Sequence, residues 1–187
     1  MIAVDSDGHL LLSSRYTSEV TKINSDTGEI IWRLGGSHNQ FTYVNDPLNG
    51  PSCQHAIRPL GNNRYTLFDN GNGHRPWASR AVEYELNPNT LTATVAWQYP
   101  ATPTTSLFAY YMGNAQRLPN GNTLINWVIG NLPKLTEVRP DGTKAFEMNW
   151  VNNPRPSPCI LTISRSSTRR RATSTWTAAS TCWIRKC

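Results

Sequence analysis

One block of pattern occurs three times along this chain of 187 residues. Each copy has a short stretch of strand-forming residues, a tight turn rich in Asn, Asp and Gly, and a second, more apolar stretch. The three copies occupy residues 1–13, 54–70 and 113–127. Repetition of this kind is typical of modular folds, in which each repeat is one small unit that buries its apolar face against the next.

The segment after each copy also repeats. Two stretches of alternating apolar and polar residues follow, joined by a turn at residues 24–28, 87–90 or 139–142. Gly and Asn tolerate a positive φ and Pro presets a turn, so these segments predict β-hairpins. Four short antiparallel strands per unit are typical of a β-propeller blade. We therefore predict an all-β fold, a partial β-propeller of about three four-stranded antiparallel blades over residues 1–153.

Two kinds of residue recur at equivalent positions in these units. Trp32, Trp97 and Trp150 close the last strand of their units. Large aromatic side chains dominate core packing, so we expect these three to pack between adjacent units. Arg58 and Arg117 also occupy matching positions, which favours a structural role such as bridging neighbouring units.

The basic charge of the chain does not belong to the repeat region. The formal net charge is +6, but seven of the eighteen cationic residues lie after Asn153 and all twelve acidic residues lie before it. Residues 1–153 therefore carry a formal charge close to −1 and offer no basic face. Nucleic acid is accordingly not an expected partner of the repeat region.

Residues 154–187 differ sharply from the repeats, with no Gly, Asp or Glu and many Ser, Thr and Arg residues. We expect a basic, irregular tail, which is either a disordered arm or sequence translated out of frame; both interpretations stay open. Three of the four cysteines lie in this tail, and no Cys-x-x-Cys pair occurs. The cysteines therefore predict neither a disulfide framework nor a zinc site.

The long connections between the units are rich in aromatic residues. They cover residues 35–53, 70–79 and 99–112 and contain Phe41, Tyr43, His74, Trp77, Phe108, Tyr110 and Tyr111. In propellers such loops line one mouth of the central channel, where specificity usually resides. No stretch approaches the roughly 18 apolar residues that span a bilayer. Met1 leads directly into a predicted strand, so no signal peptide is expected.

Six motifs in unbroken order over residues 2–150 carry a family likeness. They are SSR at 13–15, TGEIIWRLGG at 27–36, QHA at 54–56, LFDNG at 67–71, SRAVEY at 79–84 and GNAQRLPNGNT at 113–123. Together they resemble the arylsulfotransferase family of β-propeller proteins. The resemblance implies a six-bladed, usually exported protein, secreted or periplasmic, with its active site at the channel mouth. It also implies transfer of a sulfuryl group from one phenol to another through a sulfated histidine, without a nucleotide sulfate donor.

Two features depart from the family pattern. The family typically has a histidine-containing strand just before the stretch that matches residues 3–5, and that strand is not in this chain. Three blades also cannot close a six-bladed ring. We therefore expect about half of a propeller, of low stability on its own, with self-association through exposed blade surfaces.

The repeat alignment also selects candidate site residues. His55 lies on the innermost strand of its unit, which faces the channel, and neutral imidazole is a suitable nucleophile near neutral pH. Asn114 takes the corresponding position in the next unit, where its NH₂ group can hold a sulfuryl oxygen but cannot become sulfated. The resulting prediction is one catalytic residue, His55, and four substrate-binding residues, Asn114, His74, Arg75 and Arg80.

Two functions fit these residues. The first is an arylsulfotransferase-like enzyme in which His55 carries the sulfuryl group and fixed N–H donors neutralise its oxygens. The second is a non-catalytic propeller that binds a small aromatic or carbohydrate ligand, or a protein, at the channel mouth; Asn114 in place of a second histidine favours it. No phosphate cradle of the GxxxxGK type occurs, so no nucleotide, other cofactor or metal is predicted.

Overall fold

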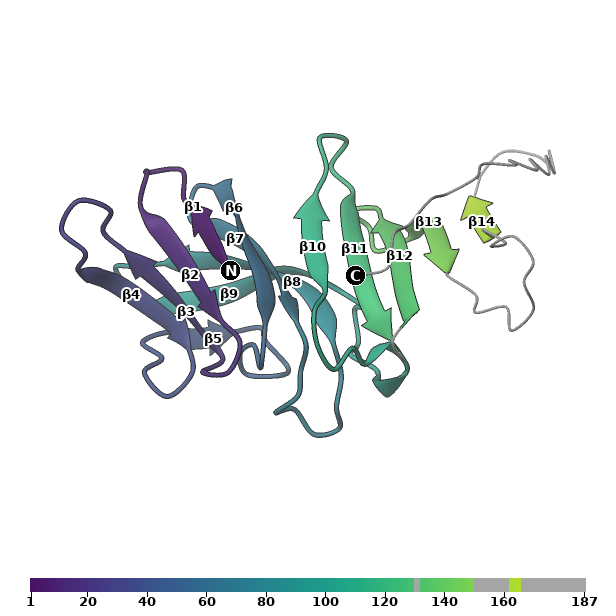
Figure 1. Ribbon diagram of the computed structural model, residues 1–187, viewed down its shortest axis with the longest axis horizontal. Coiled ribbons are helices and arrows are strands. Elements are labelled where there is room, and N and C mark those ends of the chain that lie inside the picture. Colours follow the sequence, from purple (N-terminus) through teal and green to yellow (C-terminus); the bar gives the residue numbers. More distant parts are fainter. Residues whose placement is uncertain (130–131, 150–161, 166–187) are drawn as a thin grey trace, which may run out of the picture.

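The computed structural model describes residues 1–129, 132–149 and 162–165. In this part of the chain the regular structure consists of three β-sheets and one short 3-10 helix, η1 (Thr105–Leu107). The first and third sheets lie on opposite sides of the second (Figure 1). The described residues include no helix with the length and apolar character needed to cross a membrane.

The first sheet is an antiparallel meander. Its strands follow the order β1-β2-β3-β4 and are β1 (Ile2–Val4), β2 (Leu10–Ser14), β3 (Glu19–Ile23) and β4 (Ile30–Gly35). The turn between β1 and β2 places Gly8 at φ +87° and lets its N–H donate to Asp5 O at 3.0 Å. Glycine adopts this left-handed conformation without steric cost, which explains the tight Asp-Gly turn.

The second sheet has five strands in the order β5-β9-β8-β7-β6. They are β5 (Thr42–Val44), β6 (His55–Gly61), β7 (Arg64–Asp69), β8 (Arg80–Asn87) and β9 (Thr92–Tyr99). Strands β6 to β9 form the expected antiparallel meander. Strand β5, which was not predicted, comes from the connection after the first sheet and pairs in parallel with β9.

The third sheet follows the same plan in the order β10-β11-β12-β13-β14. Its strands are β10 (Asn114–Arg117), β11 (Thr123–Ile129), β12 (Leu132–Val138), β13 (Lys144–Asn149) and β14 (Thr162–Arg165). Strand β14 lies inside the tail expected to be irregular and pairs antiparallel with β13. The other residues of that tail, and Trp150, lie outside the described residues.

The predicted fold class is confirmed, since the described chain is all-β and its three sheets have four or five strands each. The assignment of these sheets to blades of a partial propeller stays a prediction. The bridging role predicted for two arginines is also confirmed. Arg58 Nε donates to Asn114 Oδ1 at 3.1 Å, and Arg117 pairs with Glu83, so both contacts join the second sheet to the third.

The second sheet is buried on both faces, which explains why β7 and β8 have almost no exposed positions. Against the first sheet, Trp32 meets Tyr65 edge to face at 5.8 Å between ring centroids, as expected for a tryptophan that packs between units. Against the third sheet, Phe68 meets Trp127 at 5.3 Å. Trp97 also packs against this second core.

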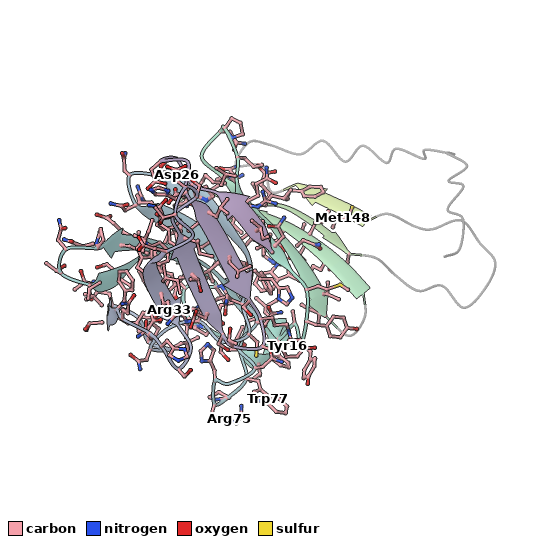
Figure 2. The ribbon with its side chains drawn as sticks, turned by 60° about the vertical axis from the view of Figure 1, so that its left-hand side comes forward. Tyr16, Asp26, Arg33, Arg75, Trp77 and Met148 are labelled. Carbon is pink, nitrogen blue, oxygen red and sulfur yellow. The ribbon has the colours of Figure 1, made fainter. Side chains whose placement is uncertain are left out.

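The antiparallel register brings four connections to one end of the three sheets. They are residues 15–18, 45–54, 70–79 and 100–113, and we call this the loop end. It is the lower end in Figure 1. Figure 2 shows Tyr16, Arg75 and Trp77 together at this end and Asp26 at the opposite end. The predicted site residues His55, His74, Arg75, Arg80 and Asn114 all lie at the loop end.

The packing of the third sheet on the second can be tested through Trp127, which is fully buried and donates from Nε1 to Thr136 Oγ1 at 3.2 Å. We expect Trp127→Ala to lower the free energy of unfolding by about 3–5 kcal/mol, because it removes core contacts and leaves a cavity. Urea denaturation of the 187-residue chain measures this loss. Tyr16→Ala, at a residue that is 92% exposed, is the control and should cost less than about 0.5 kcal/mol. Similar losses for the two variants would contradict the packing.

Candidate functional site

His55 is the first residue of β6, and a buried amide sets the position of its proton. The distance from His55 Nδ1 to Asn70 Oδ1 is 2.6 Å. Asn70 is fully buried, and its Nδ2 donates to Ala109 O and to Met112 O, both at 2.8 Å. Because these two carbonyls require the NH₂ group, the amide oxygen must face the imidazole. His55 Nδ1 therefore carries a hydrogen, and its lone pair lies on Nε2.

A β-bulge determines the direction of the His55 side chain. The pairing between β6 and β7 shifts register between His55 and Arg58, and Ala56 within the bulge has φ +58°. Bulges commonly re-aim one side chain beside a functional site. The half-buried imidazole points to Asn70, and no described residue forms a hydrogen bond with Nε2.

The loop that holds Asn70 is itself fixed by short contacts. Ser79 Oγ donates to Asn70 O at 2.7 Å and accepts from Ala109 N–H at 2.8 Å. Gly113 has φ +101°, and a Cβ at this position would lie 2.4 Å from the Phe68 ring. Only glycine permits this close approach, so residues 109–113 lie tightly against the end of β7.

Asn114, the first residue of β10, is oriented by Arg58. Its Oδ1 accepts from Arg58 Nε at 3.1 Å, and no described residue bonds to its NH₂ group. The amide therefore presents two N–H donors to a ligand, beside the positive charge of a guanidinium. Donors held in place in this way suit an anionic group.

His74 lies in the loop after β7 and binds a buried aspartate. Its Nε2 is 3.0 Å from Asp69 Oδ2, and its side chain is largely buried. Asp69 Oδ1 accepts from the backbone N–H groups of Ser52 and Gly71 at 2.8 and 3.0 Å. In this arrangement His74 fixes the loop from residue 70 to 79, at the border of the site.

Arg80 is fully buried at the centre of a charged network. Its Nε donates to Asp69 Oδ2 at 3.1 Å, and its terminal nitrogens donate to both carboxylate oxygens of Asp46 at 2.8 and 3.1 Å. A substrate contact by Arg80 would require the side chain to leave these partners, so the geometry assigns it to loop anchoring. Burial by itself raises the pKa of Asp46, but hydrogen bonds and charge from Arg80 lower it overall.

Four aromatic side chains form a continuous row at the loop end. Trp77 stacks on Phe108 with ring centroids 5.5 Å apart, and Phe108, Tyr110 and Tyr111 follow edge to face at 6.2 and 6.1 Å. We call these four residues the aromatic strip. Trp77, Tyr110 and Tyr111 are exposed, and Arg75 lies over the Trp77 ring at 5.3 Å. The strip offers apolar faces to a ring-shaped ligand.

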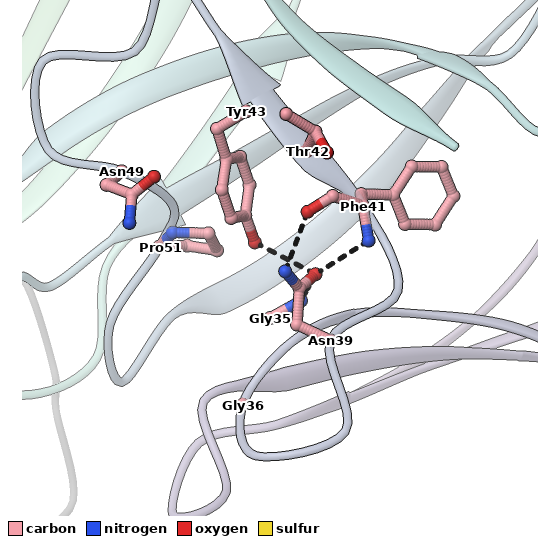
Figure 3. A pocket seen from close by; sticks show the side chains of 8 residues that line it. All are labelled: Gly35, Gly36, Asn39, Phe41, Thr42, Tyr43, Asn49 and Pro51. Carbon is pink, nitrogen blue, oxygen red and sulfur yellow. Dashed lines mark hydrogen bonds between the residues drawn. The ribbon is translucent and has the colours of Figure 1, made fainter. Parts of the chain in front are cut away.

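A separate pocket of about 390 Å³ opens between residues 35 and 51 (Figure 3). Asn39 lines this pocket, and its Oδ1 accepts from Gly35 N–H while its Nδ2 donates to Phe41 O. The side-chain amide is therefore bonded to the backbone of its own loop. Tyr43 donates to the same Oδ1; burial, followed by the charge of Asp46, raises its pKa above the usual range. None of the predicted site residues lines this pocket, so we do not assign it to the site.

Asn70 is the main functional residue that the sequence interpretation missed. It belongs to the LFDNG motif, which indicated the family but not the role of any single residue. Two of the aromatic residues predicted to line the channel mouth lie elsewhere. Phe41 is buried in the core between the first and second sheets, and Tyr43 lines the separate pocket. Within the described residues, no group of three or more His, Cys, Asp and Glu side chains could hold a metal ion.

Comparison with known proteins identifies the family of the chain. The model of one protein family, arylsulfotransferase (ASST), matches residues 1–157. This match covers most of the chain, so the protein belongs to the arylsulfotransferase family, as the sequence motifs indicate. No curated protein matches the chain. Membership supports a transferase function of the arylsulfotransferase type in general and suggests phenolic substrates.

The network around Arg80 predicts a dependence of stability on pH. Because the pKa of Asp46 is lowered in the folded state, its ion pair stabilises the fold fully above about pH 4. This stabilisation disappears as the pH falls through the lowered pKa. We therefore expect the difference in unfolding free energy between wild type and Asp46→Asn to be largest near pH 7 and to shrink below about pH 4.

Urea denaturation at several pH values measures that difference. Asp26→Asn, at an exposed turn of the opposite end, is the control and should change stability by less than about 0.5 kcal/mol. A difference for Asp46→Asn that stays constant from neutral pH to about pH 3 would show that the ion pair does not stabilise the fold.

Proposed function

We propose that this protein transfers a sulfuryl group between phenolic compounds through His55. The observation that carries the proposal is the contact between His55 Nδ1 and Asn70 Oδ1. It leaves a lone pair on Nε2, the atom that a nucleophilic imidazole must present. The aromatic strip and the donors of Asn114 support the same assignment, because an aryl sulfate has an aromatic ring and an anionic group.

In the first step, the lone pair of His55 Nε2 attacks the sulfur of an aryl sulfate. A nitrogen–sulfur bond forms while the bond between sulfur and the aryl oxygen breaks, and the electron pair leaves with the phenolate. The phenolate then takes a proton from solvent. The hydrogen on Nδ1 stays in place, and the amide oxygen of Asn70 stabilises the positive charge that develops on the ring.

In the second step, an acceptor phenol loses its proton to solvent and its oxygen attacks the same sulfur. The nitrogen–sulfur bond breaks, and its electron pair returns to Nε2, which regenerates the neutral imidazole. The NH₂ group of Asn114 and the charge of Arg58 neutralise the sulfuryl oxygens in both steps. The phenolic rings stack on the aromatic strip, and His74 and Arg75 border the entrance.

We further propose that the three sheets are successive blades of one propeller, with residues 1–153 as its repeat region. The starts of β6 and β10 then face a shared channel, which puts His55 and Asn114 on its wall. Export to the periplasm or the outside of the cell, and self-association through exposed residues such as Ile2 and Val4, belong to the same proposal.

A second function is favoured by one specific observation. Asn114 occupies the position that corresponds to His55 in the next unit, and an amide cannot carry a sulfuryl group. A protein of this family with a single histidine at these positions could therefore bind a small aromatic ligand at the loop end without transferring a group.

Substitution of His55 separates the two functions. We expect wild type to transfer sulfate from para-nitrophenyl sulfate to a phenol, and His55→Gln to lower kcat/KM by at least about a thousandfold because the nucleophile is lost. Release of para-nitrophenol measures the rate. His38→Gln, at a side chain that is 67% exposed, is the matched control and should leave the rate unchanged.

Two results would count against catalysis by His55. Equal rates for wild type and His55→Gln would remove the proposed role. Binding of phenyl sulfate by wild type, with neither turnover nor sulfate on the histidine, would instead support the binding function.

A further inference from the structure

Seven of the arginines that the structure describes fall into two groups by their partners. Arg33, Arg64, Arg80 and Arg117 pair with carboxylates. Arg15, Arg58 and Arg75 bond to neutral oxygens instead, and no described carboxylate pairs with them. These last three belong to the loop end and its neighbouring strand β6. Three arginines that bond to neutral oxygens therefore lie around the candidate site.

Arg15 is the member of this group that has no assigned role. It follows β2 directly, and its guanidinium donates to Tyr110 O at 2.9 Å. Its Cζ atom lies 5.2 Å from the centre of the Tyr16 ring and 5.7 Å from that of Tyr110. The Nε atom is shielded from solvent and has no hydrogen-bond partner. A buried donor without a partner is uncommon in folded proteins and indicates a missing acceptor.

Two separate sets of contacts hold the Arg15 loop next to His55. On one side, Ser18 Oγ accepts from Cys53 N–H at 2.9 Å, and Gln54 Nε2 donates to Glu19 O at 2.9 Å. Cys53 and Gln54 directly precede His55. This set therefore ties the loop between β2 and β3 to the start of β6.

On the other side, Arg15 bonds to Tyr110, which lies between the two residues that hold Asn70. The carbonyls of Ala109 and Met112 accept from the amide that orients His55. The Arg15 guanidinium therefore bonds directly to the segment of residues 109–112, and the His55 imidazole bonds to the same segment through Asn70. Such attachment at two points places a charged group with little freedom to move away.

We propose that Arg15 is an anion-binding residue of this site, which the first sheet contributes to recognise the sulfate group of an aryl sulfate. A guanidinium suits this task because its planar set of N–H donors matches the oxygens of an oxyanion. The rings of Tyr16 and Tyr110 flank the same group and favour an aromatic ligand. The sulfate would supply the acceptor that Nε lacks. This inference rests on the proposed function for the identity of the ligand, but it concerns binding and not turnover.

Binding to the 187-residue chain tests the proposal in the His55→Gln variant, where no transfer can consume the ligand. Titration calorimetry with phenyl sulfate and with neutral phenol measures the two dissociation constants. We expect Arg15→Gln to weaken the binding of phenyl sulfate by about 10-fold or more, since it removes charge-assisted hydrogen bonds, and that of phenol by less than about twofold. Arg64→Gln, at the opposite end and paired with Glu83, is the control and should leave both constants unchanged.

Arg15→Lys provides a second test that keeps the charge. Lysine cannot present the planar set of donors, so we expect it to restore part of the affinity for phenyl sulfate and to leave the binding of phenol unchanged. The proposal is overturned if Arg15→Gln leaves phenyl sulfate binding unchanged, or weakens both ligands equally. If Arg15→Gln does not fold, full wild-type affinity in Arg15→Lys overturns it, and a selective loss for phenyl sulfate supports it.

The outcomes also distinguish this proposal from the proposed function. Loss of turnover in His55→Gln tests the nucleophile alone. A protein without any turnover that still shows the selective effect of Arg15→Gln would have the anion site but not the transfer reaction.

Discussion

The amide of Asn70 is the interaction on which the candidate site depends. It is buried at the end of β7, and its two ends bind different parts of the fold: the oxygen binds His55 on β6, and the NH₂ group binds the carbonyls of Ala109 and Met112. One side chain therefore sets the tautomer of the histidine and the course of the loop before β10. Because the Asn70 side chain is fully buried, losing one of these hydrogen bonds leaves a buried polar group without a partner.

Buried ion pairs occur at both ends of the molecule, but arginines bound only to neutral oxygens lie near the site. At the end opposite the loops, Lys22 pairs with Asp5 and Asp7; burial alone would lower its pKa, but hydrogen bonds and charge from these carboxylates raise it overall. At the loop end Arg80 also forms ion pairs, with Asp46 and Asp69, but Arg15 and Arg58 bind neutral oxygens and keep their charge available. Structural ion pairs stabilise the sheets, whereas the site leaves positive charge for an anion.

Local signals in the sequence were sufficient for most of the strands. Each meander strand lies between turns of Gly, Asn, Asp and Pro, whose backbone preferences act over a few residues. The same reasoning could not find β5, because its partner β9 lies about fifty residues further along the chain and no turn joins the two. It could not find β14 either, since this strand lies in a segment without hairpin signals. Pairing of this kind depends on contacts that only the folded chain provides.

The same limit explains what could be predicted of the site. The repeat alignment found His55 and Asn114 because both begin the first strand of a unit, and it found Arg58 because it recurs. The contact between His55 and Asn70 depends on the bulge at Ala56, which has φ +58° although it is not glycine. An alanine carries no sequence signal for a bulge, so the alternation of β6 alone would assign the imidazole to a regular strand position. The catalytic proposal therefore rests on a backbone irregularity, and the residue that this irregularity faces, Asn70, also bonds to the loop before Gly113.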